Sequence, residues 1–172
     1  MHATASPSMD IQVSSNFERL LFEAGGRDAD TVRRLMAQLN QSGRFVLPDA
    51  MLAAIRSEFD AGRADETETA AAIRAAWREA GELVDPHTAV ALAVADRDVT
   101  DSHVPNIVLS TAHAAKFPEA VAAACGMRPQ LPPWLDGLMT RPEQAKTLAN
   151  DQAEVERFIL SVSRAAKQGV AN

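Results

Sequence analysis

The chain has 172 residues, a formal net charge of −6 and one cysteine, Cys125. This length suits a single domain with a core of useful size. The acidic balance, without a dense Lys/Arg cluster, excludes the electrostatic footprint of a protein that binds nucleic acid or an anionic membrane. The single cysteine excludes an internal disulfide framework and a cysteine-rich zinc site.

The composition also constrains the fold class and the compartment. Apolar residues make up 47% of the chain, but aromatic residues only 5%, and tyrosine is absent. A core built from aliphatic side chains with few aromatic ones suits packed helices better than a β-sandwich. The longest apolar run, residues 89–95, is too short to span a bilayer, and no targeting signal stands out. We therefore expect a cytoplasmic protein with no membrane or nucleic-acid partner. The four histidines lack metal-ligand spacing, so we expect no metal.

Residues 14–97 carry the start and stop signals of a helical block. Each expected helix begins at a polar residue or a proline, and a glycine ends it. The four segments run from Ser15 to Gly25, from Asp28 to Gly43, from Pro48 to Gly62 and from Asp65 to Gly81.

The start of the first expected helix has two compatible interpretations. Ser15 and Glu18 have the spacing of a capping box, in which Ser15 caps the helix and Glu18 reaches back to it. A helix N-terminus with Asn16 and Arg19 nearby is also a natural seat for a phosphate group.

A second motif, Asp85-Pro86-His87-Thr88, predicts the start of another helix. Asp85 suits the N-cap and Pro86 the first helical position. The residues that follow, through Ala95, are apolar on all sides, so we expect a buried helix. We interpret His87, at its mouth, as a hydrogen-bonded structural histidine.

Residues 105–126 predict a strand, a polar turn and a helix. Ile107 to Leu109 form a short apolar run typical of a buried strand, and Ser110 and Thr111 follow at its carboxyl end. Open α/β sheets bind ligands at that end of their strands, although this segment taken alone favours an ordinary strand-to-helix connection. His113 and Lys116 are expected to organise the turn. A Ser110/His113 hydrolase pair has no nucleophile elbow to support it.

Residues 127–172 predict a helical tail. A proline-rich stretch leads to a short apolar helix near Trp134. A last helix is expected from about Asp151 to Lys167, with a buried stripe that includes Val155, Ile159 and Val162.

Three segments, taken in order, carry a more specific signal. Ser14-Ser-Asn-Phe-Glu-Arg19, Asp85-Pro-His-Thr-Ala-Val90 and Ser110-Thr-Ala-His-Ala-Ala-Lys-Phe117 resemble the C-terminal part of bacterial-type threonine synthase. That family consists of pyridoxal-phosphate-dependent lyases of fold type II. The resemblance runs from Ser6 to the final helix. Two mild departures are Ala114, where the family usually has proline, and Ala91, where glycine is common.

The resemblance implies an α/β fold. Residues 1–172 would be one segment, the mostly helical C-terminal portion of the enzyme, with a few strands that belong to a larger sheet. The family converts O-phosphohomoserine and water to threonine and phosphate, with pyridoxal 5'-phosphate as the electron sink. Thr111 or Ser110 would face the pyridine nitrogen of the cofactor. Ser15, Asn16 and Arg19 would lie on the substrate side.

The resemblance also implies that part of the active site is missing. The family binds its cofactor through a lysine far upstream, in a Phe-Lys-Asp-type context, and cradles the cofactor phosphate in a glycine-rich loop. The three lysines here, Lys116, Lys146 and Lys167, stand in other contexts, and the chain has no glycine-rich loop. We expect no catalytic residue in this segment, and no activity without the N-terminal portion of the enzyme.

Two other hypotheses remain open. In the first, the chain is a non-catalytic helical module that needs a partner chain. In the second, it is a degenerate homologue with another role. The fragment and the module both predict exposed apolar surface that another chain would cover.

Overall fold

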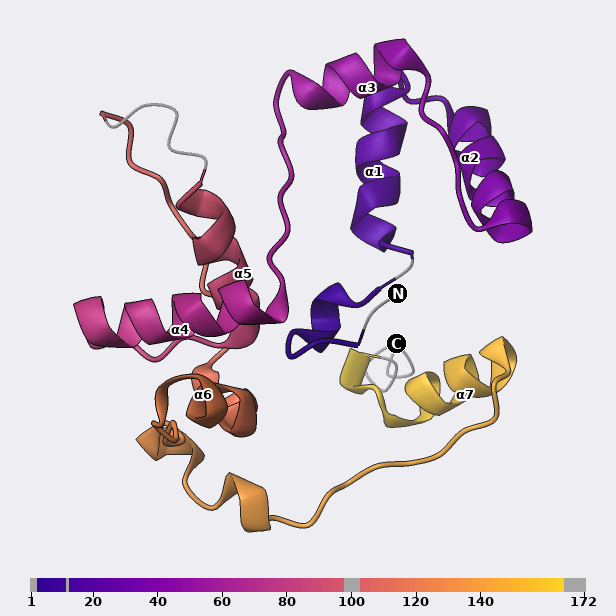
Figure 1. Cartoon of the computed structure of the whole chain (residues 1–172). Coiled ribbons are helices and arrows are strands. Elements are labelled where there is room, and N and C mark those ends of the chain that lie inside the picture. Colours follow the sequence, from indigo (N-terminus) through magenta and orange to yellow (C-terminus); the bar gives the residue numbers. More distant parts are fainter. Residues whose placement is uncertain (1–2, 12, 98–102, 166–172) are drawn as a thin grey trace. The chain divides into compact units, whose positions relative to one another are not determined.

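The structure is a computed structural model that describes residues 3–11, 13–97 and 103–165. The chain divides into two compact units, Met1–Leu131 and Pro132–Asn172. The regular structure of the described residues is helical throughout (Figure 1). The α-helices are α1 (Ser15–Ala24), α2 (Ala29–Ser42), α3 (Asp49–Arg56), α4 (Glu66–Ala80), α5 (Pro86–Ala95), α6 (Pro118–Cys125) and α7 (Gln152–Val162). Short 3-10 turns are η1 (Pro7–Met9), η2 (Ala114–Lys116), η3 (Pro133–Leu135) and η4 (Leu138–Thr140).

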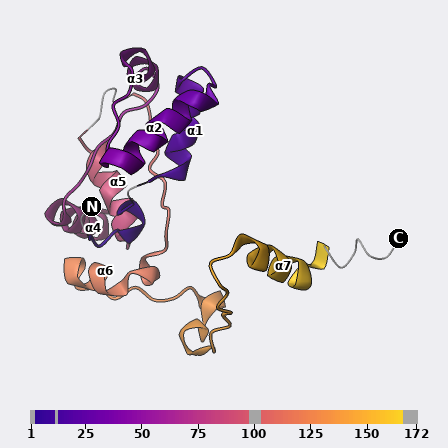
Figure 2. The same ribbon diagram turned by 90° about the vertical axis from the view of Figure 1, so that its right-hand side faces the viewer.

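The first three helices share one small core. Leu21 of α1, Leu35 of α2 and Met51 of α3 are buried together. Phe45 and Leu47, from the connection between α2 and α3, pack against this cluster. α1 and α2 lie side by side in both views (Figures 1 and 2). Since each helix contributes only one fully buried large side chain, this core is thin.

A second core joins α4, α5, η2 and α6. Its buried members are Ile73, Ala89, Ala114, Val121 and Ala124. Three of these five are alanines, and small side chains let helix backbones approach closely. The packing of α4 against both α5 and α6 can be followed in Figure 1. This core supports the site described below.

Most of the helix starts predicted from the sequence are confirmed. The carboxylate of Asp65 accepts from the backbone N–H of Glu68, and Glu68 reaches back to Asp65, so α4 begins with a complete capping box. Asp85 caps α5, with Pro86 at its first position. The capping role of Ser15 is wrong, because Ser15 is already helical. The N-cap is Ser14, which makes no side-chain cap hydrogen bond.

Glycine stops are confirmed at two of the three later positions predicted for residues 14–97. Gly43 and Gly81 both adopt the left-handed conformation directly after α2 and α4. The third, Gly62, does not end its helix. α3 ends at Arg56, six residues earlier, and Phe59, which follows it, is half exposed.

The expected strands do not form among the described residues. The single β-contact there is an isolated antiparallel bridge between Val84 and His113. The segment predicted to be a buried strand is extended but exposed, at 81% for Ile107 and 72% for Leu109. A strand needs partner strands for its backbone groups, and the described chain places none beside it. The α/β expectation is thus correct only for its mostly helical part.

The C-terminal unit is loosely built. The short apolar helix expected near Trp134 is replaced by the two turns η3 and η4. α7 ends at Val162, and Lys167 lies outside the described residues. The predicted buried stripe is wrong within this unit, because Ile159 is 53% exposed and Val162 is similarly open. In the described parts of the chain, no helix is long and apolar enough to cross a membrane.

Candidate functional site

The start of α5 is a buried and fully hydrogen-bonded polar cluster. Asp85 has no solvent exposure. Its carboxylate accepts from the backbone N–H groups of His87 (3.0 Å) and Thr88 (3.1 Å). The same carboxylate accepts from the Thr88 hydroxyl and from Nδ1 of His87, which lies 2.6 Å away. Four donors thus converge on one carboxylate at a helix N-terminus, where negative charge is favoured.

This geometry fixes the charge state of Asp85. Burial by itself raises the pKa of the carboxyl group. The hydrogen bonds from Thr88 and His87 outweigh that effect and lower the pKa of Asp85 below its ordinary value. The group therefore stays ionised, and it stabilises the local structure as an acceptor instead of acting as an acid.

The same cluster holds the N-terminal segment of the chain. The backbone N–H of Ser8 donates to Nε2 of His87 over 3.2 Å. Thr4 donates to Asp10 through both its N–H (2.7 Å) and its hydroxyl (2.8 Å), which closes a short loop. We call residues 4–10 the N-terminal strap. His87 is thus a hydrogen-bonded structural histidine, as the sequence predicts.

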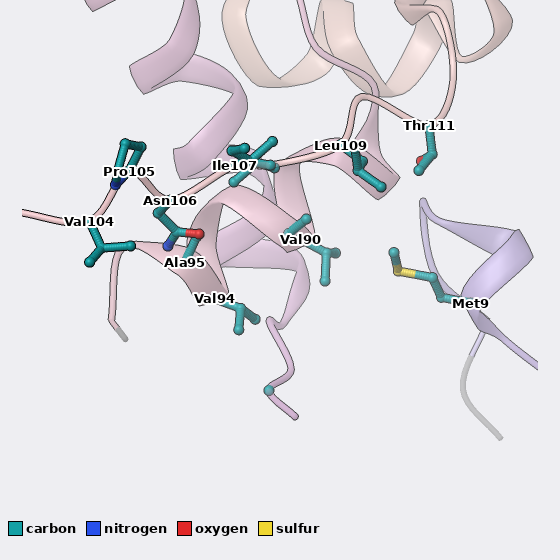
Figure 3. A pocket seen from close by; sticks show the side chains of 13 residues that line it. Met9, Val90, Val94, Ala95, Val104, Pro105, Asn106, Ile107, Leu109 and Thr111 are labelled. Atoms are coloured by element: carbon teal, nitrogen blue, oxygen red, sulfur yellow. The ribbon is translucent and has the colours of Figure 1, made fainter. Parts of the chain in front are cut away.

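One end of the strap reaches a pocket along α5 of about 670 Å³, which we call the α5 pocket. Val90 and Val94 of α5 line one wall, the extended segment 104–109 lines another, and Met9 comes from η1. Figure 3 shows Met9 and Thr111 at the same end of the pocket, with Val104 at the opposite end. Among the residues that the structure describes, the lining contains no charged residue. It suits apolar groups, with the Thr111 hydroxyl as a polar contact at one end.

In the pocket wall, the backbone at Gly62 lies very close to the side chain of Val94. Gly62 packs against Val94, and a Cβ at position 62 would lie 2.5 Å from Cγ1 of Val94. Atoms at this distance overlap, so any side chain at position 62 forces Val94 to move. Gly62, which was expected to stop a helix, is instead needed for close packing.

One of two hydroxyls, Thr111 or Ser110, was expected to face the cofactor, and of these two Thr111 lines the pocket. Thr111 is exposed and belongs to the α5 pocket, whereas Ser110 is exposed but not part of its lining. The turn after Thr111 is held by His113, whose Nδ1 accepts from the backbone N–H of Ala115 over 3.1 Å. The bridge between His113 and Val84 ties this turn to the start of α5. His113 therefore organises the turn, as predicted.

The residues expected on the substrate side lie elsewhere. Ser15, Asn16 and Arg19 are all exposed on the first turns of α1. Ser15 and Arg19 line a groove of about 550 Å³ between α1 and α2, which is separate from the α5 pocket. Asn16 is not part of that lining. The described structure does not bring these side chains together with Thr111 in one pocket, and their binding roles stay predictions.

Sequence reasoning missed the N-terminal strap. Its contacts with His87 and with Glu66, which accepts from the N–H of Ala5, join residues more than 60 positions apart. No local pattern encodes such pairs. The sequence did offer one indication of an ordered strap, because Thr4, Ser6 and Asp10 supply closely spaced hydrogen-bonding groups.

Three kinds of comparison place the chain among known proteins. The family described as "Threonine synthase, C-terminal" matches residues 88–159. The threonine synthase of Pseudomonas aeruginosa is 41% identical over 160 residues, which cover 92% of this chain and 34% of that protein. Human threonine synthase-like 1 is 40% identical over 121 residues, or 70% of this chain and 16% of that protein.

A solved structure gives the same result at the level of the fold. The crystal structure of PLP-bound threonine synthase from Brucella melitensis matches 95% of this chain with a TM-score of 0.79 and 53% sequence identity. The match covers 35% of that chain. This chain thus spans about a third of the length of the threonine synthases it matches. The resemblance to the C-terminal part of threonine synthase is confirmed.

Proposed function

Because this chain is similar to the C-terminal region of threonine synthases over more than nine tenths of its residues, we propose that it is the C-terminal segment of such an enzyme. The complete enzyme is a cytoplasmic, pyridoxal-phosphate-dependent lyase that converts O-phosphohomoserine and water to threonine and phosphate. The observation that carries this proposal is the 53% identity to a PLP-bound threonine synthase across 95% of the chain.

The residues present fit only part of the cofactor. When bound, pyridoxal phosphate acts as an electron sink for carbanions. Thr111 offers a neutral hydroxyl at the edge of an apolar pocket, which suits a pyridine ring and its nitrogen. The described part of the lining has no cationic side chain to hold a phosphate group. Lys116, the lysine nearest to Thr111 in the sequence, lies 5.9 Å from the Phe117 ring centroid and is not part of the pocket lining.

We therefore derive no catalytic step from this segment alone. The lysine and the phosphate cradle have to come from the upstream portion of the enzyme, which we propose as the partner. The exposed apolar segment 104–109 supports this view. Val104, Ile107 and Leu109 are 65–81% exposed, and no backbone hydrogen bond joins Pro105–Ser110 to the rest of the described chain. A strand from the upstream portion, paired with this segment, would cover the apolar side chains and supply hydrogen-bond partners for the backbone.

The same exposed surface also favours the alternative function, a non-catalytic helical module that binds a partner chain. The two functions differ in the role of Thr111. In the enzyme segment its hydroxyl contacts the cofactor, whereas in a binding module it has no special task.

Complementation tests both functions. We would mix the chain with the upstream two thirds of the Brucella melitensis enzyme and measure phosphate release from O-phosphohomoserine and the visible absorbance of the cofactor. Activity is expected only in the mixture. Thr111→Val should weaken cofactor binding about tenfold, as expected for the loss of one hydrogen bond.

Two matched variants complete the design. Thr67→Val removes an exposed hydroxyl on α4, far from Thr111 in sequence, and should change nothing. Ser110→Ala tests the other candidate hydroxyl. A complex that forms without cofactor or turnover would support the binding module. Turnover by the isolated chain would contradict our account of the missing lysine.

A further inference from the structure

His87 lies between a hydrogen-bond acceptor and a hydrogen-bond donor, which contact opposite nitrogens of its imidazole ring. The ring is 5% exposed. Nδ1 lies 2.6 Å from a carboxylate oxygen of Asp85, and Nε2 lies 3.2 Å from the backbone nitrogen of Ser8. A carboxylate only accepts and a backbone N–H only donates. The ring is therefore neutral in this arrangement, with its proton on Nδ1 and a lone pair on Nε2 that receives the Ser8 N–H.

Protonation would remove one of these two contacts. The imidazolium carries N–H groups at both nitrogens, so Nε2 can no longer accept from Ser8. The two N–H groups would then point at each other, while the bond from Nδ1 to Asp85 would become stronger. The proton and the N-terminal strap thus compete for the lone pair on Nε2.

The neighbouring elements add few charges around this ring. Phe117 packs against it with the two rings tilted by 57° and 4.7 Å between their centroids, and Lys116 lies near the same Phe117 ring. On the strap, Asp10 is occupied by two hydrogen bonds from Thr4. On α4, Glu66 accepts from the strap at Ala5. Among the groups described, Asp85 alone makes a direct charged contact with His87.

The strap links this ring to the α5 pocket. Met9 follows Ser8 directly, and its side chain forms part of the pocket lining near Thr111 (Figure 3). The other hydrogen bond from the strap to a described helix, from Ala5 to Glu66 of α4, is long, at 3.3 Å to the nearer oxygen. Losing the Ser8 contact therefore removes the hydrogen bond between the strap and a helix that lies closest to Met9 in the sequence.

We propose that His87 is a pH-sensitive latch: in its neutral form it holds the N-terminal strap on α5, and on protonation it releases the strap and withdraws Met9 from the α5 pocket. This inference concerns the chain's own hydrogen bonds and does not depend on the enzymatic function proposed above. It predicts that the pocket opens toward solvent on its Met9 side as the pH falls.

The test uses the full 172-residue chain labelled with ¹⁵N and ¹³C. We would follow the ring nitrogens of His87, the hydrogen-exchange protection of the Ser8 amide and the Met9 methyl resonance from pH 8 to pH 5. The neutral ring should carry its proton on Nδ1. One pH unit below the His87 midpoint, only about one strap in ten should still be held, because roughly one neutral ring in ten remains, so most of the Ser8 protection seen at pH 8 should be lost. The Met9 methyl shift should move at the same midpoint.

An internal reference separates latch release from unfolding. The Thr88 amide donates to Asp85, which stays ionised in this range, so its protection should persist. Equal loss at Ser8 and Thr88 would overturn the proposal, as would a neutral ring protonated at Nε2. A Met9 methyl that does not respond would overturn the coupling to the pocket.

Two variants sharpen the result. His87→Gln supplies an amide oxygen that can accept from Ser8 but does not titrate, so Ser8 protection should become independent of pH. His113→Gln changes a histidine that caps η2 instead of holding the strap, and should leave the Ser8 titration as in the wild type. If His87→Gln fails to fold, the wild-type comparison of Ser8 with Thr88 still decides the question.

Discussion

The N-terminal end of α5 and the segment from Pro105 to Ser110 are opposite kinds of structure in one unit of the chain. At the end of α5, Asp85 is completely buried and every buried side-chain polar atom of the described residues has a hydrogen-bond partner. In the segment, Ile107 and Leu109 point apolar side chains toward solvent, and the backbone groups lack protein partners among the described residues.

The difference shows which of the two regions finds its hydrogen-bond and packing partners within this chain. Partners within three residues satisfy the Asp85 carboxylate, so the cap of α5 is encoded locally. The Pro105–Ser110 segment has the composition of an interior strand and the environment of a surface loop. Such a mismatch between residue type and surroundings marks a surface that another chain segment would cover.

The largest effect is expected from Asp85→Ala. The change leaves four donors without their buried acceptor, which should cost about 3–5 kcal/mol of the free energy of unfolding. Urea denaturation measures it. Asp65→Ala, which removes an exposed cap, should cost only about 1 kcal/mol. Equal losses for the two variants would contradict the special status of the α5 cluster.

A somewhat smaller loss is expected from Ile73→Ala in the core of α4, α5 and α6. Ile73 is 2% exposed, and its truncation leaves a cavity that should cost about 3 kcal/mol. Thermal unfolding with far-UV circular dichroism reports the shift. Ile73→Val, which removes a single methylene, should cost about 1 kcal/mol. A negligible change for Ile73→Ala would mean that this core does not hold the unit together.

Acidification should act on Asp85 in a defined direction. Its folded pKa lies below the ordinary value of 3.8, so its stabilising contribution is present above that value and is lost as the pH falls through the folded pKa. The unfolding free energies of the wild type and Asp85→Asn, compared between pH 6 and pH 2.5, should therefore converge at the acidic end. Curves that stay parallel would show that the ionised form contributes nothing.

The smallest effect on stability is expected from Ile107→Asn. Since Ile107 is 81% exposed, the isolated chain should change by no more than about 0.5 kcal/mol. Association with the upstream portion of a threonine synthase should nevertheless weaken, and analytical ultracentrifugation of the mixture measures that. A large loss of stability in the isolated chain would contradict the exposed position of Ile107 and mean that the segment is already packed.

Local signals in the sequence predicted the helices well, and non-local contacts explain most of the errors. The capping box of Asp65 and the cap and proline at the start of α5 depend on neighbours within three residues. The strand at Ile107 failed because strands need partners distant in sequence. The bond between Ser8 and His87 was missed for the same reason. Thr111 was placed beside a pocket only by the structure.

The two small cores described for the helices have a consequence for how the chain melts. Leu21, Leu35 and Met51 form one buried group, and Ile73, Ala89 and Val121 belong to another, with no buried residue common to both. Cooperative unfolding requires that the loss of one contact weakens the next, and separate groups transmit little of that coupling. Heating should therefore melt α1–α3 and α4–α6 at different temperatures, with a calorimetric enthalpy larger than the van't Hoff enthalpy.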